Sequence, residues 1–387
     1  MEYKLKELFD LQMGKTPSRN NSDYWNTKDN KWISIADLSK CEKYITDTKE
    51  YISDIAIKES GINPIPANTV VMSFKLSIGK TAITKEVIYS NEAIMSFRDK
   101  KTIELLPDYT YYLMMSKRWD EGTNKAVMGK TLNKATLSEI KVSVHDIAEQ
   151  QRIVNVLDKL TTLIDKRKQQ LEKLDELVKA RFVELFGEPV INPKSWETAP
   201  LSALILKANN GMARRGKDAD GSIVLRLVEL QNGFIDYSAP NRICLNETEK
   251  KRYELVDNDF LFARVNGNPD YVGRCAVFKG IGEPVFHNDH IIRVHFDETK
   301  LNGCFTSVLL NSDYGKRQMR EQIKTSAGQY TISQDGIGAI MTILPPMELQ
   351  NQFAAFVEQT DKSKLEVKKS LEKLELLKNA LMQKYFG

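Results

Sequence analysis

The 387-residue sequence lacks long hydrophobic runs and has few cysteines. No stretch of about 18 consecutive apolar residues occurs, so we expect no transmembrane helix. The first residues, MEYKLK, lack the apolar segment of a secretory signal. The cysteines form no C-x-x-C pair, which excludes the common zinc-ribbon spacings and argues against a disulfide scaffold. We therefore expect a soluble protein of the reducing cytoplasm, with an apolar share of 41% that suffices for packed cores.

An excess of charge of one sign is also lacking. The net charge is only +4, from 56 basic and 52 acidic residues, so any surface for nucleic acid has to be a local patch. Residues 1–145 contain 19 Lys and 3 Arg, whereas residues 188–347 contain 9 Lys and 10 Arg. Arginine favours bidentate contacts with base edges and lysine acts as a point charge. If both segments contact DNA, we expect them to recognise different features.

Recognisable catalytic motifs are missing as well. The sequence has no G-x-S-x-G, no H-E-x-x-H, and no Asn/Asp-Pro-Pro-aromatic tetrapeptide of the kind that amino-methyltransferases use. The triplet Gly-Lys-Thr occurs three times, at 14–16, 79–81 and 129–131. A nucleotide-binding P-loop also needs a glycine five residues earlier, and those positions hold Phe9, Phe74 and Asn124. We predict no catalytic residue in this chain and interpret the triplets as small basic loops.

What the sequence does contain is an internal repeat with an offset of 200 residues. Residues 171–174 and 371–374 are both LEKL, and residues 186–187 and 386–387 are both Phe-Gly. Gln150 aligns with Gln350, and the similarity continues without a gap for about 38 residues. The preceding segments align more weakly but in the same order, for example 32–38 with 224–230 and 68–72 with 258–262. The chain is therefore a tandem duplication with the order globule, helix, globule, helix.

The two repeated segments carry a heptad pattern. Hydrophobic positions recur at alternating steps of four and three from Ile153 to Leu185 and from Phe353 to Tyr385. Polar residues interrupt the two seams at different places, such as Arg167 and Lys364, so each seam can complement the other. About 38 residues at ~1.5 Å each predict a helical spacer of roughly 57 Å.

The globular segments have the pattern of α/β or α+β domains. We expect strands at 70–74, 223–227 and 290–296, and helices at 108–118 and 307–324. The motif His287-x-x-His290, with His295 and Cys275 nearby, is reminiscent of a metal site. The aligned residues 90–93 of the first half offer no equivalent ligands, so we predict no metal.

Polar and basic loops occupy the same aligned positions in both halves, with different side chains. Residues 12–19 align with 209–216, residues 73–80 with 263–274, and residues 128–131 with 327–331. Lys80 and Lys130 are suited to anchor phosphates, and arginine or asparagine in the second half has the reach to contact base edges. The candidate DNA-binding residues are Lys15, Thr16, Arg19, Lys75, Lys80, Lys130, Thr131, Arg214, Arg215, Arg264, Asn266, Arg274 and Tyr330.

Three kinds of segment carry a further similarity: residues 145–153 and 345–353, which lead into the helices, the tails 180–187 and 380–387, and the openings 5–17 and 32–38. In these segments the sequence resembles the specificity subunits of Type I restriction–modification systems. The resemblance implies a first target recognition domain at 1–145, a conserved helix at 146–187, a second recognition domain at 188–344 and a second helix at 345–387. In this fold class, two tandem α/β (α+β) recognition domains are separated by two long helices that form an antiparallel coiled coil.

The resemblance also implies a function and partners. Each recognition domain would recognise one half of a bipartite, asymmetric site in double-stranded DNA, and the helices would set the spacing. Two modification subunits and the restriction subunits would bind this non-catalytic chain. They would supply S-adenosylmethionine, ATP and Mg²⁺ chemistry, with no cofactor on this chain. The candidate partner-binding residues on the helices are Val156, Leu163, Phe182, Phe356, Leu377 and Met382.

Three alternatives are open at this stage. The first is a fused methyltransferase or nuclease, against which the missing catalytic tetrapeptide argues. The second is a specificity subunit of another restriction architecture, and the third is a non-catalytic coiled-coil regulatory protein. The third predicts that neutralising Lys80 and Arg264 changes nothing, whereas the main hypothesis predicts weaker DNA binding with a reduced salt dependence.

Overall fold

The computed structural model describes residues 1–75, 77–117, 119, 133–326 and 328–387. These residues form two compact units. Unit 1 comprises Met1–Gln169 and Lys368–Gly387, and unit 2 comprises Gln170–Val367. The units are divided differently from the four predicted segments, because each unit takes part of both long helices. The predicted domain boundaries therefore stay a prediction. None of the described helices is long and apolar enough to span a membrane.

Unit 1 is built on a mixed five-stranded sheet with the strand order β2-β9-β6-β7-β4. These strands are β2 (Phe9–Met13), β4 (Tyr44–Ile45), β6 (Val70–Ser73), β7 (Thr81–Thr84) and β9 (Ile94–Asp99). A second sheet has the order β5-β3-β8, with β3 (Asn30–Ile33), β5 (Glu50–Ile52) and β8 (Tyr89–Ser90). β1 (Glu2–Lys4) pairs with β10 (Lys141–Ser143). The short helices are α1 (Leu5–Leu8), α2 (Ile35–Leu38), α3 (Asp54–Ser60) and α5 (Lys134–Glu139).

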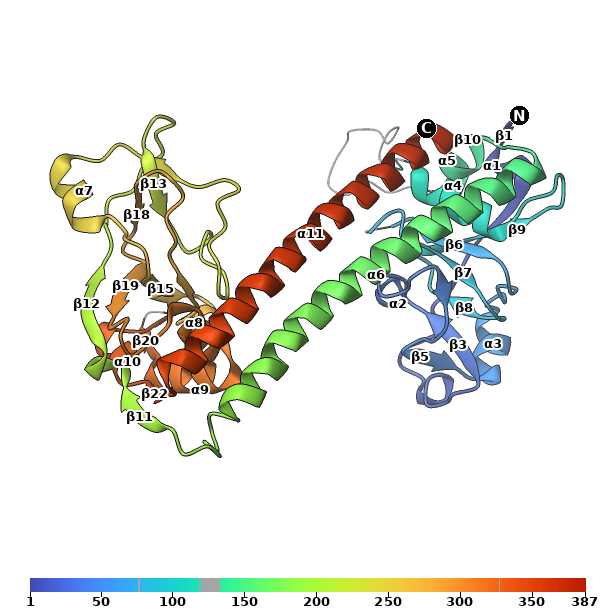
Figure 1. Ribbon diagram of the computed structural model, residues 1–387. Helices are drawn as coiled ribbons and strands as arrows, with labels where there is room; N and C mark the ends of the chain where they lie inside the picture. Colours follow the sequence, from blue (N-terminus) through green and yellow to red (C-terminus); the bar gives the residue numbers. More distant parts are fainter. Residues whose placement is uncertain (76, 118, 120–132, 327) are drawn as a thin grey trace. The chain divides into compact units, whose positions relative to one another are not determined.

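The core of unit 1 joins this sheet to the long helices. Helix α4 (Pro107–Ser116) packs on β6 and β7. The first part of α6 (Ile147–Phe186) and the end of α11 (Met347–Phe386) contribute Ile153, Leu157 and Phe386 to the same hydrophobic cluster. In Figure 1, the start of α6 (green) and the end of α11 (red) lie beside α4. Residues more than 200 positions apart in the sequence therefore stabilise one core.

Unit 2 repeats this arrangement. Its main sheet has the order β12-β19-β15-β17, with β12 (Ile205–Asn210), β15 (Asp259–Ala263), β17 (Cys275–Val277) and β19 (Ile291–Phe296). The second sheet has the order β14-β13-β18, with β13 (Ser222–Leu225), β14 (Arg242–Ile243) and β18 (Val285–His287). β11 (Glu197–Pro200) pairs with β22 (Met341–Leu344). β3 and β8 run parallel in unit 1, as β13 and β18 do in unit 2.

The remaining elements of unit 2 include a small sheet without a described equivalent in unit 1. This sheet has the order β16-β21-β20, with β16 (Val265–Asn266), β20 (Lys324–Ser326) and β21 (Gln329–Thr331). The helices are α7 (Glu247–Tyr253), α8 (Gly303–Asn311), α9 (Asp313–Gln322) and α10 (Gln334–Gly338). The predicted single helix at 307–324 is wrong. The chain breaks at Ser312, which is extended (φ −70°, ψ 169°) and caps α9 through its hydroxyl oxygen.

Two aligned glutamines show how closely the units correspond. The Gln150 side chain accepts a hydrogen bond from Leu106 N (3.0 Å) and donates to Glu104 O (3.0 Å) and His145 O (2.9 Å). The Gln350 side chain accepts from Asn302 N (2.8 Å) and donates to Lys300 O (3.0 Å) and Pro345 O (2.8 Å). Both glutamines are buried. Each joins the start of a long helix to the chain that leads into α4 or α8, so the repeat in the sequence is a repeat in structure.

The long helices pack along the predicted heptad seams. Every seam position from Ile153 to Leu185 and from Phe353 to Tyr385 is buried or half-buried. Within unit 1, Lys168 lies 3.7 Å from Glu375 and the Arg152 guanidinium lies over the ring of Tyr385, so the helical segments run antiparallel. Within unit 2, Lys364 pairs with Asp175 at 2.7 Å. The predicted fold class, with two α/β domains in tandem and an antiparallel helix pair, is confirmed.

Candidate nucleic-acid interface

In unit 1 the candidate loops meet at one end of the main sheet. β2 ends at Met13 and β6 at Ser73, while their antiparallel neighbours β9 and β7 begin at Ile94 and Thr81. The loops that leave or enter these strands carry Lys15, Thr16, Lys75 and Lys80. Antiparallel pairing places all of these strand ends at the same edge. The structure thus gathers residues that are 65 positions apart in the sequence.

A glycine allows the first of these loops to pass close to a neighbouring one. A Cβ atom at Gly14 would lie 2.1 Å from Ser90 O, and a Cβ atom at the aligned Gly211 would lie 2.2 Å from Asn288 O. Lys15 N donates to Ser90 O (2.8 Å), and Met212 N donates to His287 O (3.0 Å). Only glycine fits such an approach of two backbones. The same crossing therefore positions the basic loop in both units.

A carboxylate lies among the basic groups of unit 1. The Thr16 hydroxyl donates a hydrogen bond to Glu92, which follows β8. This hydrogen bond lowers the pKa of Glu92, and the charges of Lys75 and Arg19 lower it further. Glu92 is therefore ionised at neutral pH, where it holds the loop through Thr16 and offsets one of the positive charges around it.

Two tryptophans hold the end of the same loop. The Arg19 guanidinium lies 3.8 Å from the ring centre of Trp25 and 5.0 Å from that of Trp32, and it pairs with Glu50. Trp25 Nε1 donates to Ser18 O (3.0 Å), and Trp32 Nε1 donates to Lys15 O (3.1 Å). Arg19 is exposed but its guanidinium is already stacked and paired, so it is a fixed cation.

In unit 2 the candidate loops meet at the equivalent edge. β12 ends at Asn210 and β15 at Ala263, whereas β17 begins at Cys275 and β19 at Ile291. Arg214 and Arg215 follow β12, Arg264 follows β15, and Arg274 precedes β17. The equivalent edge thus carries arginine where unit 1 carries mainly lysine.

The turn between β18 and β19 is the centre of this cluster. The Arg215 guanidinium pairs with the Asp289 carboxylate (2.7 Å) and lies 3.1 Å from His290 Nε2. Arg264 donates from Nη1 to Asp289 O (3.1 Å), and its backbone N donates to His290 O (2.8 Å). Asp289 corresponds to Glu92 of unit 1, so both units place an acid at the centre of the basic edge.

The other candidates of unit 2 lie around this centre. Asn266 pairs with Tyr330 across β16 and β21. Arg214 pairs with Glu249 of α7 at 2.8 Å. Arg274 donates to Leu230 O (3.2 Å) and Gln231 Oε1 (3.1 Å), and its guanidinium lies 4.4 Å from the ring centre of Tyr271. Lys130 and Thr131 lie outside the described residues.

Sequence reasoning missed one arginine at this edge. Arg226 directly follows β13, and with Arg214 and Arg215 it lines a hollow of about 240 Å³. Asn241 and Asn288 also line this hollow. The alignment of 224–230 with 32–38 contained the signal, because it places Arg226 where unit 1 has Ser34.

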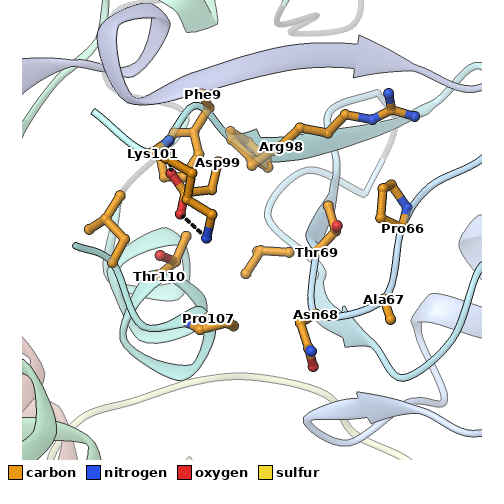
Figure 2. Close-up of a pocket in the computed structure, with 13 residues that line it drawn as sticks. Phe9, Pro66, Ala67, Asn68, Thr69, Arg98, Asp99, Lys101, Pro107 and Thr110 are labelled. Atoms are coloured by element: carbon orange, nitrogen blue, oxygen red, sulfur yellow. Dashed lines mark hydrogen bonds and ion pairs between the residues drawn. The ribbon is translucent and has the colours of Figure 1, made fainter. Parts of the chain in front are cut away.

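A larger hollow of about 560 Å³ lies at the opposite end of the main sheet of unit 1. Figure 2 shows Asn68 and Thr69, which precede β6, across from Pro107 and Thr110 of α4. Asp99 at the end of β9 pairs with Lys101 at 2.9 Å. Because the candidate loops are at the other end of β6 and β9, this hollow takes no part in the candidate interface.

The candidate partner-binding residues on the helices divide into two groups. Leu163 and Leu377 are exposed, with 44% and 47% of their surface accessible. Val156, Phe356 and Met382 are half-buried, and the last two pack against the cores of their units. Phe182 is only 5% exposed and stacks on Phe305 at 5.6 Å. It is a core residue of unit 2, which corrects its prediction as a docking residue.

Comparison with known families identifies a relationship in the first half of the chain. Residues 1–176 match the family described as "Type I restriction modification DNA specificity domain". The specificity subunit of the StySPI Type I restriction enzyme of Salmonella potsdam is 27% identical over 300 residues, which cover 72% of this chain and 65% of the relative. The EcoKI specificity subunit of Escherichia coli K12 is 26% identical over 271 residues, which cover 65% and 58%. The chain therefore spans less than two thirds of the length of these relatives.

Solved structures extend the likeness to the whole fold. The S subunit of a Type I restriction–modification system from M. genitalium matches with a TM-score of 0.57 and 14% identity, covering 100% of this chain and 96% of that one. A chain from a study of complex assembly and conformational transition of the Type I system matches with a TM-score of 0.64 and 13% identity, covering 99% and 96%. At such low identity these two likenesses establish the fold alone. The sequence matches therefore relate this chain to the specificity subunits of Type I restriction–modification systems, and the solved structures show that it shares their fold.

Proposed function

We propose that this chain provides the DNA specificity of a Type I restriction–modification complex. The globular part of each unit recognises one half of a bipartite site in double-stranded DNA. The observation that carries the proposal is that equivalent sheet edges in the two units gather basic and amide side chains from three or more loops. These loops superpose in topology but differ in side chains, with Lys75 and Lys80 in unit 1 and Arg264 and Arg274 in unit 2.

The chemistry of the two edges favours an asymmetric site. Lysines neutralise backbone phosphates without distinguishing bases, whereas the planar guanidinium groups of unit 2 match the acceptors of base edges. Two recognition units on one chain also gain affinity through effective concentration, because binding of the first places the second near its half-site. A site with two different specific halves and an unspecific spacer of fixed length follows from this arrangement.

We propose the partners and cofactors on the same basis. Two modification subunits bind along the long helices, where Leu163 and Leu377 are exposed. These subunits use S-adenosylmethionine to methylate adenine, and restriction subunits add ATP-dependent and Mg²⁺-dependent steps. The chain itself is a non-catalytic subunit. Since its substrate is cellular or invading DNA, we place the complex in the cytoplasm.

The test is a genome-wide map of adenine methylation in a host that expresses the full chain with its neighbouring modification subunit. The expected result is a single motif with two specific parts, different from one another, and a spacer of constant length. A host with the modification subunit alone is the control and should show no such motif. A stable complex that methylates a continuous motif, or none, would overturn the proposal and favour a regulatory coiled-coil protein.

A further inference from the structure

The hollow around Arg226 lies directly beside the candidate interface of unit 2. Arg226 follows β13, whose parallel neighbour β18 ends at His287. Both strand ends therefore lie beside the turn at Asp289 that organises the candidate interface. The backbone N of Asn288 in this turn donates to Leu225 O (3.0 Å), so Arg226 is tied to the interface through adjacent backbone.

A buried carboxylate fixes the Arg226 side chain. The Glu229 side chain is 4% exposed and accepts hydrogen bonds from Arg226 Nη2 (2.6 Å), Nε (3.2 Å) and backbone N (2.7 Å). The Arg226 side chain is 43% exposed. The Nε–Nη2 edge of the guanidinium is thus fixed by Glu229, while the rest of the group reaches solvent. A guanidinium held in this way loses little entropy when it binds a ligand.

The charges around the hollow favour a neutral ligand. Arg214, Arg215 and Arg226 are each matched by a carboxylate, from Glu249, Asp289 and Glu229 respectively. This balance removes the net positive charge that would attract a phosphate. What remains is a surface rich in hydrogen-bond donors above the buried side chains of Val224 and Ile243. It suits an uncharged planar group with several acceptors.

We propose that Arg226 recognises a guanine in the half-site that residues 188–344 bind. In the major groove, guanine is the base that presents two acceptors side by side, O6 and N7, and a guanidinium matches both. The inference rests on the proposed function and deepens it by naming a residue and a base.

The equivalent position of unit 1 supports a role in asymmetry. There the sequence has Ser34, whose backbone N and hydroxyl both bond the Asp37 carboxylate (2.9 and 2.7 Å). Both units have the carboxylate, Asp37 in unit 1 and Glu229 in unit 2. Only in unit 2 is its bonded partner a long side chain, that of Arg226, which reaches solvent. This position therefore distinguishes the two recognition units on a shared framework.

The test compares methylation motifs made by the full complex with the wild-type chain, with Arg226→Lys, and with the double variant Arg226→Gln/Glu229→Gln. Arg226→Lys retains the charge opposite Glu229 but removes the planar fork, and the double variant removes both charges together. For each variant we expect discrimination of guanine at one position of one half-site to fall by roughly tenfold or more. The other half-site and the spacer should remain unchanged.

The matched control is Arg242→Lys. Arg242 also lies in unit 2 and pairs with a carboxylate, Glu283 at 2.9 Å, but it faces the start of β13 rather than its end. This variant should leave the whole motif unchanged. A bipartite motif that keeps its guanine preference in both Arg226 variants, or a half-site without guanine, would overturn the inference and leave the proposed function intact. A wild-type complex without a bipartite motif would overturn both.

Discussion

At the scale of single residues, the structure separates cations that are free to meet phosphate from cations that are already paired. Lys80 is exposed at the candidate edge, where only its backbone atoms bond Ser73 (3.1 and 2.9 Å) among the interactions described. Arg19 and Arg214, in contrast, pair with Glu50 and Glu249. We therefore expect Lys80 to contribute more to non-specific affinity than either arginine.

Lys80→Gln should weaken DNA binding about equally for all sequences. Loss of one phosphate contact should reduce the slope of log K against log salt by about 0.9. The measurement is a fluorescence-anisotropy titration of the full complex at several salt concentrations. Lys101→Gln is the control, since Lys101 is 81% exposed but belongs to the opposite end of the same sheet. Equal effects of the two substitutions would show that general charge, rather than this edge, governs binding.

One buried histidine should make unit 2 sensitive to acid. Burial and, to a smaller extent, the charge of Arg293 together lower the pKa of His287 to about 4. Because the folded pKa lies below the ordinary value of 6.5, the unfolded chain takes up this proton first as the pH falls. The contribution of His287 to stability is therefore unchanged above pH 6.5 and declines between pH 6.5 and 4.

The expected loss from this residue between pH 7 and pH 5 is about 2 kcal/mol, since one pKa unit corresponds to about 1.4 kcal/mol. Urea unfolding of the full chain at the two pH values measures it. In His287→Gln the pH dependence should be smaller by that amount, whatever its effect on stability at pH 7. An NMR signal of His287 that titrates near pH 6.5 in the folded chain would contradict the prediction.

At the scale of elements, the helix pair tolerates charged residues inside its hydrophobic seam. Lys364 is 20% exposed and reaches Asp175 and Asp361, at 2.7 and 3.4 Å. Lys378 is also half-buried, and burial lowers its pKa while Asp165 raises it. Buried charges of this kind stabilise a helix pair less than apolar side chains of similar size.

Lys378→Met should therefore stabilise unit 1, by up to about 1 kcal/mol. Urea unfolding followed by circular dichroism measures the change. Lys373→Met on the same helix is the control, because Lys373 is exposed and its replacement should be nearly neutral. If Lys378→Met were destabilising while the control was neutral, the attraction between Lys378 and nearby carboxylates such as Asp165 would outweigh the cost of its burial.

The elements also show how far the sequence predicts the structure. The heptad pattern predicts the helix pair residue by residue, because one periodicity determines burial along a straight element. The break at Ser312 was missed because it depends on one residue, whose extended backbone and hydroxyl cap start a new helix within a segment of otherwise helix-compatible residues. Phe182 was misplaced because the pattern describes the partner helix but not the domain that packs on its other face, where Phe305 lies.

The candidate site was predictable in its loops but not in its geometry. The alignment of the two halves located Arg215 and Arg264, yet their common partner Asp289 depends on which strands are neighbours. Arg226 was not predicted as a site residue because it follows β13, a strand of the second sheet. The end of β13 reaches the interface only because β13 pairs with β18. Strand order is a long-range property, which local patterns do not specify.

At the scale of the whole molecule, the duplication ties each domain to a remote part of the chain. Phe386 lies in the core of unit 1, with its ring 5.3 Å from that of Tyr109, and Lys117 Nζ donates to Phe386 O (3.0 Å). Its counterpart Phe186 lies in the core of unit 2, with its ring 4.7 Å from that of Phe305. The domain that precedes α6 is thus completed by the end of α11, and the domain that precedes α11 is completed by the end of α6. This crossed arrangement explains why the repeats retain the same terminal Phe-Gly.

The crossed arrangement predicts a reciprocal pattern of damage. Phe386→Ala should destabilise unit 1, although residue 386 follows the second globular segment, and Phe186→Ala should destabilise unit 2. Each substitution removes a buried ring and should cost about 3 to 5 kcal/mol in its own unit. Hydrogen exchange followed by mass spectrometry resolves the two units in the intact chain. Phe386→Ala should accelerate exchange in α4, and Phe186→Ala should accelerate it in α8. Each variant is the control for the other, because the unaffected unit reports the background. If each variant instead loosened the globular domain that precedes its own long helix, the helices would pair in the opposite sense, and the two units could not share one pair of helices in this way.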